Sequence, residues 1–356
     1  MKILHVVGAR PNFMKVAPVW RAIDKMTDFD QLLIHTGQHY DKNMSDVFFN
    51  ELELREPNEY LGVGSGSHAE QTAAIMVAIE QILTKNKPDF VMVYGDVNST
   101  VAATIVCSKL LIPVGHVEAG LRSFDRTMPE EINRLITDQI SDILFTPSKD
   151  ANINLLREGI SLENIHLVGN VMIDTLVRLL PKSDISFMKE ISYPYALVTL
   201  HRPSNVDHDI MLREIIKTLI EISKSIQVIF PVHPRTKQKI DEFSLEIPDS
   251  GNLRLMEPIG YLDFLALQSR AKVVITDSGG IQEETTFLGV PCLTVRENTE
   301  RPVTVSIGTN SLVGKDMELL KEKMYNILDG KFKHGKVPQL WDGNASIRIV
   351  KVLKSM

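Results

Sequence analysis

The segment VVITDSGGIQEE, residues 273–284, contains the transition that decides the fold. Its β-branched residues 273–276 predict a buried strand, and Ser278, Gly279 and Gly280 predict a tight turn. The residues that follow predict a helix, so the segment has the strand–turn–helix order of an anion-binding α/β unit. Glu283 and Glu284 lie in the first turn of that helix, where a bound anion would meet negative charge, so they need an explanation of their own.

The same alternation of short apolar runs and helical periods extends over the whole chain in two series. We expect strands at 3–7, 32–36, 90–94, 114–117, 143–145 and 166–168, and then at 196–200, 227–232, 254–256, 273–276 and 292–295. We expect helices at 12–26, 69–83, 130–138, 210–223 and 317–328. Apolar strands separated by helices indicate parallel sheets covered on both faces, so the sequence predicts two doubly wound α/β domains.

The predicted boundary falls near residues 169–174 or in the polar stretch 181–194, and we place the domains at 1–170 and 171–343. The amphipathic segment at about 344–356 is predicted to be a helix. Its docking site stays open at this stage, and packing back onto the first domain is one possibility.

The bulk composition is that of an ordinary globular protein of 356 residues with 44% hydrophobic residues and a net charge of −6. This charge gives no indication of a nucleic-acid or membrane partner. Cys107 and Cys292 lie far apart in apolar segments, which favours buried free thiols and a reducing compartment. The N-terminal residues resemble a strand rather than a signal peptide, and we expect a cytoplasmic protein.

Acidic residues follow two of the predicted strands of the first domain. Asp96 comes after the strand at 90–94. Asn98 and Ser99 would suffice to cap the next helix, so Asp96 is available for a functional role. Glu118 ends a very apolar strand, where partial burial would raise a carboxyl pKa toward the range useful in proton transfer. The alternative for Glu118 is a simple ion pair with Arg122.

The segment RTMPEEINR, residues 126–134, predicts a helix start with proline and two acids in the first turn. Glu130 and Arg134 have the spacing of a surface pair, whereas Glu131 points about 100° away on a helical wheel. The two acids therefore need not share a role.

In the second domain, basic side chains follow the strands. His201 and Arg202 follow one strand, and His233 and Arg235 follow the next. Together with the turn at 278–280 they indicate phosphate binding, while the first domain supplies acid/base groups. The chain lacks the glycine-rich motifs of P-loop and dinucleotide-binding proteins, a G-x-S-x-G elbow and a metal-ligand cluster, which disfavours those chemistries.

The ordered motifs of the chain resemble the non-hydrolysing UDP-N-acetylglucosamine 2-epimerase family. They are GARPNFMK at 8–15, GD at 95–96, GHVEAGLR at 115–122, PEEINR at 129–134, GN-x-x-ID at 169–174, HR at 201–202, PVHP at 231–234, TDSGGIQEE at 276–284 and TERP at 299–302. The resemblance implies two Rossmann-like domains facing a cleft in the GT-B arrangement. It also implies a homodimer that interconverts UDP-GlcNAc and UDP-ManNAc without a metal or redox cofactor.

The resemblance implies elimination of UDP to a 2-acetamidoglucal and its re-addition, with roles for individual residues. The implied catalytic residues are Asp96, Glu118, Glu131 and His201. The implied substrate- and UDP-binding residues are Arg10, Lys15, Arg202, His233, Ile259, Phe264, Ser278, Gly279, Gly280, Glu284 and Arg301. Phe264 matches a uracil contact and Glu284 a ribose contact, whereas Glu283 is expected to be a helix-start or surface acid.

Three positions depart from the family pattern. Tyr40, two residues after Gln38, replaces the arginine of the branch regulated by its own substrate, Val97 replaces a frequent threonine, and RPSN follows His201. The first departure argues against allosteric activation by UDP-GlcNAc. The alternatives are a 2-epimerase acting on UDP-2,3-diacetamido-2,3-dideoxy-glucuronic acid, a GT-B glycosyltransferase, a sugar-nucleotide-binding regulator and a hydrolysing relative.

Overall fold

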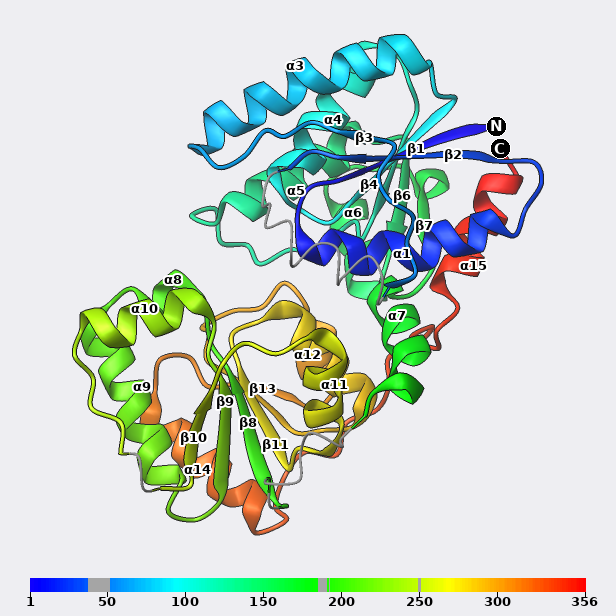
Figure 1. Cartoon of the computed structure of the whole chain (residues 1–356). Coiled ribbons are helices and arrows are strands. Elements are labelled where there is room, and N and C mark those ends of the chain that lie inside the picture. Colours follow the sequence, from blue (N-terminus) through cyan, green and yellow to red (C-terminus); the bar gives the residue numbers. More distant parts are fainter. Residues whose placement is uncertain (38–51, 185–190, 192, 249–250) are drawn as a thin grey trace. The chain divides into compact units, whose positions relative to one another are not determined.

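The computed structural model describes residues 1–37, 52–184, 191, 193–248 and 251–356, which form two compact units. The N-terminal unit comprises Met1–Val177 together with Gln339–Met356, and the C-terminal unit comprises Arg178–Pro338. Figure 1 shows that each unit has helices on both faces of a sheet. The prediction of two doubly wound α/β domains is confirmed.

The N-terminal sheet is parallel throughout and has the strand order β3-β2-β1-β4-β5-β6-β7. Its strands are β1 (Lys2–Val7), β2 (Asp30–His35), β3 (Glu59–Tyr60), β4 (Phe90–Tyr94), β5 (Val114–Val117), β6 (Ile143–Thr146) and β7 (Ile165–Leu167). Its helices are α1 (Arg10–Asp24), α3 (His68–Asn86), α4 (Asn98–Lys109), α5 (Pro129–Ile140), α6 (Lys149–Arg157), η1 (Leu162–Asn164), α7 (Val171–Leu179) and α15 (Ala345–Lys354).

The C-terminal sheet repeats this topology with the parallel order β10-β9-β8-β11-β12-β13. Its strands are β8 (Tyr195–Thr199), β9 (Gln227–Pro231), β10 (Leu253–Met256), β11 (Val273–Thr276), β12 (Cys292–Thr294) and β13 (Asn310–Leu312). Its helices are η2 (Leu180–Lys182), α8 (Pro203–Val206), α9 (Asp209–Ile222), α10 (Pro234–Glu242), α11 (Tyr261–Arg270), α12 (Gly279–Leu288), α13 (Pro302–Ser306) and α14 (Met317–Leu328).

The strand order reverses once in each sheet, between β1 and β4 and between β8 and β11. Ligands of open α/β sheets bind beyond the carboxyl ends of the strands at such a reversal. The loops that follow β1, β4, β8 and β11 are therefore the places where a ligand of each unit is expected.

The helix α15 returns the chain to the N-terminal unit, where it packs against α1 (Figure 1). Its start is fixed by the buried carboxylate of Asp174, which accepts bonds from the N–H of Ala345 at 3.0 Å and from the N–H and hydroxyl of Ser346 at 2.7 Å. The GN-x-x-ID motif thus contributes a structural acid that anchors the last helix.

Candidate active site

The turns after β4 and β5 place Asp96 and Glu118 at the carboxyl edge of the N-terminal sheet. Gly95, between β4 and Asp96, has a φ of 65°, and Glu118 has a φ of 76°, a left-handed conformation that costs a non-glycine residue free energy. The buried Glu118 carboxylate forms an ion pair with the buried ammonium group of Lys15, which extends from α1. A candidate catalytic acid therefore sits in a strained conformation beside a fixed cation, an arrangement common at functional sites.

The alternative pairing of Glu118 with Arg122 is wrong. The Arg122 guanidinium is buried and donates instead to Asp138 at 2.7 Å and to Glu158 at 2.6 Å. The actual partner of Glu118 is Lys15 on α1, which is distant in the sequence. Inspection of neighbouring positions therefore could not identify it.

Arg134 on α5 joins two of the predicted catalytic acids. Its guanidinium forms ion pairs with Asp96 and, at 2.6 Å, with Glu131, which is 1% exposed. Glu131 also accepts backbone N–H bonds from Ser123 at 3.0 Å and Phe124 at 2.9 Å. Donors on several sides fix the position and orientation of this carboxylate.

The predicted surface pair of Glu130 and Arg134 is therefore wrong, because Arg134 is buried and turned toward Glu131 and Asp96. Sequence reasoning missed Arg134 as a site residue. The available signal was its i,i+3 spacing from Glu131, which competes with the i,i+4 spacing from Glu130.

The start of α4 also differs from the prediction. Val97 is the N-cap residue, and neither Asn98 nor Ser99 caps the helix. The Asn98 amide instead donates to Gln71 at 2.8 Å and accepts from Asn133 at 3.1 Å. Asn98 thereby lines a pocket of about 220 Å³ that opens beside Asp96 and is lined by Ser65, Gly66, His68, Gln71, Asp96, Val97, Asn98, Pro129, Glu130 and Asn133.

In the C-terminal unit, the buried carboxylate of Asp277 organises the residues after β8. It accepts the backbone N–H groups of His201 and Arg202 at 3.0 and 2.9 Å, and it lies 3.1 Å from Nδ1 of His201. Burial by itself would raise the pKa of Asp277, but its bonds to His201 and Arg202 hold that pKa below the usual value. The carboxylate therefore orients His201, a residue that the sequence analysis singled out without its partner.

The start of α12 has the properties of an anion site. Ser278 is its N-cap residue, and its side chain does not cap the first N–H groups of the helix. A Cβ atom at Gly279 would lie 2.4 Å from Nη1 of Arg301, which shows how closely the guanidinium approaches the helix start. Backbone N–H groups, the helix dipole and Arg301 thus converge at the carboxyl end of β11.

The two adjacent glutamates of α12 have different partners. Glu283 is buried and forms an ion pair with Nε of Arg301 at 2.7 Å, so the prediction of a surface acid is wrong. Glu284 is also buried and accepts the hydroxyl of Tyr261 at 2.9 Å. Burial raises the pKa of Glu284 to about 7.

Comparison with known proteins relates both units to one family. The sequence model of the family described as UDP-N-acetylglucosamine 2-epimerase matches residues 21–354. A protein of Methanocaldococcus jannaschii named UDP-N-acetylglucosamine 2-epimerase is 45% identical over 364 residues, which cover 99% of both chains. The chain belongs to this family. Since its members are enzymes, the chain is assigned to an enzyme family, as predicted.

Solved structures of 2-epimerases share the whole fold. The structure of the Methanocaldococcus jannaschii UDP-GlcNAc 2-epimerase in complex with UDP-GlcNAc and UDP has a TM-score of 0.93, 44% identity and full coverage of both chains. The Neisseria meningitidis enzyme bound to UDP-GlcNAc has a TM-score of 0.89 and 32% identity, again over both complete chains. A Pseudomonas aeruginosa UDP-2,3-diacetamido-2,3-dideoxy-D-glucuronate 2-epimerase is 39% identical over 359 residues, which cover both chains completely.

The remaining residues suggested by the family resemblance lie at several places. His233 is the N-cap residue of α10, and its ring lies 5.6 Å from that of His201. Ile259 and Phe264 pack, half-buried, against an apolar cluster in the C-terminal unit. Arg10 is the first residue of α1, whereas Gln38 and Tyr40 lie outside the described residues.

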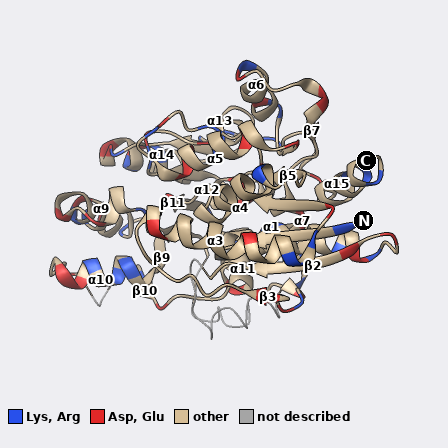
Figure 2. Ribbon diagram, turned by 90° about the horizontal axis from the view of Figure 1, so that it is seen from above, with Lys and Arg blue, Asp and Glu red and all other residues tan. Residues whose placement is uncertain are grey.

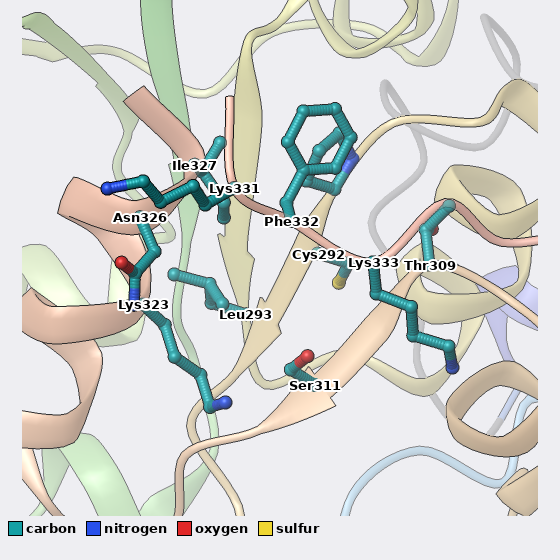
Figure 3. A pocket seen from close by; sticks show the side chains of 11 residues that line it. Cys292, Leu293, Thr309, Ser311, Lys323, Asn326, Ile327, Lys331, Phe332 and Lys333 are labelled. Atoms are coloured by element: carbon teal, nitrogen blue, oxygen red, sulfur yellow. The ribbon is translucent and has the colours of Figure 1, made fainter. Parts of the chain in front are cut away.

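Another pocket, of about 140 Å³, lies in the C-terminal unit and includes none of these residues in its lining. It is lined by Pro291, Cys292, Leu293, Thr309, Ser311, Lys323, Asn326, Ile327, Lys331, Phe332 and Lys333. Figure 3 shows that the amino groups of its three lysines point in different directions. They do not converge on a common anion, so this pocket is not a second candidate site for the 2-epimerase substrate.

Basic and acidic residues are interspersed over the ribbon in Figure 2 rather than gathered by sign. No described helix has the length and apolar character that crossing a membrane requires.

Proposed function

We propose that this protein is a non-hydrolysing 2-epimerase that interconverts UDP-GlcNAc and UDP-ManNAc. The observation that carries the proposal is the set of three acids, Asp96, Glu118 and Glu131, held by the cations of Lys15 and Arg134. Lys15 and Arg134 fix the positions of these carboxylates, as a base or a stabiliser of developing positive charge requires.

In the proposed elimination, one carboxylate removes the proton from C2 of the sugar, and the C1–O bond breaks with its electron pair leaving on UDP. A double bond forms between C1 and C2 of a 2-acetamidoglucal. In the reverse step a diphosphate oxygen attacks C1, and a proton is delivered to C2 from the opposite face. Positive charge develops at C1 during bond cleavage, and Asp96, Glu118 or Glu131 stabilises it electrostatically.

The C-terminal unit is proposed to hold UDP. The uncapped start of α12 and Arg301 suit the diphosphate, and His201, oriented by Asp277, suits a proton donor to the departing oxygen. Glu284 suits the ribose hydroxyls, and Phe264 with Ile259 suits the uracil ring. Arg10, Arg202 and His233 complete the proposed binding set.

A neutral sugar is favoured over a uronic acid by the charges around Asp96. Among the residues that the structure describes, the pocket beside Asp96 is lined by two acids, Asp96 and Glu130, and by no lysine or arginine. A carboxylate on the substrate would meet like charge there, which costs binding free energy. This supports UDP-GlcNAc over its diacetamido uronic acid derivative, the activity for which the Pseudomonas aeruginosa relative is named.

The test is incubation with UDP-GlcNAc in D₂O, followed by NMR. We expect deuterium at C2 as UDP-ManNAc appears, and much slower exchange with the diacetamido uronic acid derivative in a parallel sample. Absence of C2 exchange in UDP-GlcNAc would overturn the proposed substrate. Exchange in the uronic acid derivative alone would transfer the assignment to that substrate, and sugar transfer without exchange would indicate a glycosyltransferase.

We further propose a cytoplasmic homodimer that serves polysaccharide biosynthesis. The basis is the full-length similarity to relatives named UDP-N-acetylglucosamine 2-epimerase. Light scattering at micromolar concentration tests the dimer, and a mass of one chain, 40.0 kDa, would contradict it.

A further inference from the structure

A buried cluster of ionisable residues is hydrogen-bonded to the turns that carry Asp96 and Glu118. Its members are His116 on β5, Asp138 on α5 and Arg122 after β5, which are at most 2% exposed. None of them belongs to the acids proposed to act on the sugar. Ionised groups are rarely buried this completely without a partner, so their arrangement calls for a physical account.

Asp138 accepts hydrogen bonds from three directions. One oxygen accepts the N–H of Gly120 at 3.0 Å and the guanidinium of Arg122 at 2.7 Å, and the other lies 2.7 Å from Nδ1 of His116. Burial alone would raise the pKa of Asp138, but the charges of His116 and Arg122 keep it below its usual value. Asp138 is therefore ionised and acts only as an acceptor.

The second nitrogen of the His116 ring faces another acceptor. Its Nε2 lies 2.8 Å from the carbonyl oxygen of Gly95, the residue that immediately precedes Asp96. A carbonyl oxygen cannot donate, so Nε2 carries a proton, and Nδ1 carries one because it faces the ionised Asp138. A ring protonated at both nitrogens donates to both acceptors.

The cluster connects both acid-bearing turns. His116 fixes the carbonyl of Gly95, and Asp138 fixes the N–H of Gly120, two residues after Glu118. Gly95 and Gly120 have φ angles of 65° and 80°, and a Cβ atom at Gly95 would lie 3.2 Å from the Glu118 carboxylate. Glycine adopts these φ angles without strain, so the cluster acts on the relative position of two closely packed turns.

We propose that His116 is a positioning residue, whose doubly protonated ring, held by Asp138, sets the position of Asp96 through the Gly95 carbonyl. This inference rests on the proposed function only for its kinetic consequences. Small misplacement of a catalytic group costs on the order of 100-fold in rate, so the loss of this contact should appear in kcat. UDP binding is assigned to the C-terminal unit and should not change.

Two variants separate the two hydrogen bonds. In His116→Asn the amide occupies the place of Nδ1 and keeps the bond to Asp138, but it does not reach Gly95. In His116→Gln the amide occupies the place of Nε2 and keeps the bond to Gly95. We expect kcat for C2 exchange to fall about 100-fold in His116→Asn and no more than about 10-fold in His116→Gln, with KM and the Kd of UDP within about threefold.

Thr137→Val is the matched control. Thr137 precedes Asp138 on α5, is fully buried, and its hydroxyl has no hydrogen-bond partner among the residues that the structure describes. Removing that hydroxyl should leave kcat within about twofold. If His116 served folding alone, loss of its contact with the charged Asp138 would be the more harmful change. His116→Gln, which loses that contact, would then have a lower kcat and a lower melting temperature than His116→Asn. That result would overturn the proposal.

A measurement on the unaltered protein covers the case in which the variants do not fold. Proton–nitrogen correlation NMR of the histidine rings should show both nitrogens of His116 protonated at neutral pH. A ring with one unprotonated nitrogen would overturn the proposal. Failure of the protein to exchange C2 of UDP-GlcNAc would contradict the proposed function instead, and the NMR result would still decide the state of His116.

Discussion

Replacement of Glu284 by glutamine should make the protein more stable above neutral pH. Burial raises the pKa of this carboxyl from 4.5 to about 7 in the folded state. At about 1.4 kcal/mol per pH unit, this difference corresponds to about 3 kcal/mol of unfolding free energy. The folded state keeps the proton to higher pH than the unfolded state, so this group makes the wild-type protein less stable as pH rises from 4.5 to 7.

Glutamine keeps the oxygen that accepts the hydroxyl of Tyr261 but does not ionise. We therefore expect Glu284→Gln and wild type to have similar stability near pH 4.5 and the variant to exceed wild type by about 3 kcal/mol at pH 8. Urea unfolding of the full-length wild type and variant, followed over this pH range, measures the difference in unfolding free energy. Glu246→Gln, which changes an exposed glutamate of the same unit, is the control and should show no such divergence.

Parallel stability curves for wild type and Glu284→Gln would refute the reasoning, because they would show that burial does not raise the pKa of Glu284. The same residue has a functional test in Glu284→Ala. If Glu284 binds ribose, this variant should weaken UDP by about tenfold and leave pyrophosphate unchanged, since pyrophosphate has no ribose. Equal losses for both ligands in calorimetry would contradict the division between phosphate and ribose contacts.

Four further variants test the two halves of the site. Asp96→Asn and Glu131→Gln should each lower the rate of C2 exchange by 10²-fold or more while the Kd of UDP stays within about twofold, and a normal rate in either would remove that residue from the catalytic set. Asp277→Asn removes the charge that orients the neighbouring imidazole, so kcat should fall on the order of 10-fold, and unchanged kcat would mean that this orientation is unimportant. Gly279→Ala places a methyl group 2.4 Å from a guanidinium nitrogen of Arg301, so UDP should bind about tenfold more weakly in calorimetry, and retained affinity would argue against a diphosphate at the start of α12.

The regular elements were predictable because hydrophobic periodicity decided them. The strands at 90–94, 114–117 and 273–276 and the helix at 317–328 have the predicted boundaries, and the other predicted strands differ by one or two residues at an end. The predictions missed β3 and β13, short strands at the edges of their sheets. Edge strands have one unpaired side and need no continuous apolar run, so Glu59–Tyr60 and Asn310–Leu312 gave no signal.

The ion pairs were much less predictable than the elements. For Arg122, Arg134 and Glu283 the sequence suggested a nearby partner or a surface position, and each of these side chains is buried against other groups. Local spacing rules describe exposed helix surfaces, where i,i+4 neighbours compete only with water. At the carboxyl edge of a sheet, the partner is set by which loops the strand order brings together, and that information is not local.

The glutamates that seemed to contradict an anion site at the start of α12 are each prevented from opposing it, by different means. Glu283 forms an ion pair with Nε of Arg301, and Nη1 of the same guanidinium lies close to Gly279. Glu284 is held by burial at a pKa of about 7, so it is partly protonated near neutral pH and carries less than a full charge. The acid pair therefore places a cation at the helix start and adds only part of a negative charge. The two glutamates are therefore compatible with the diphosphate site that we propose at the start of α12 and with the proposed ribose contact of Glu284.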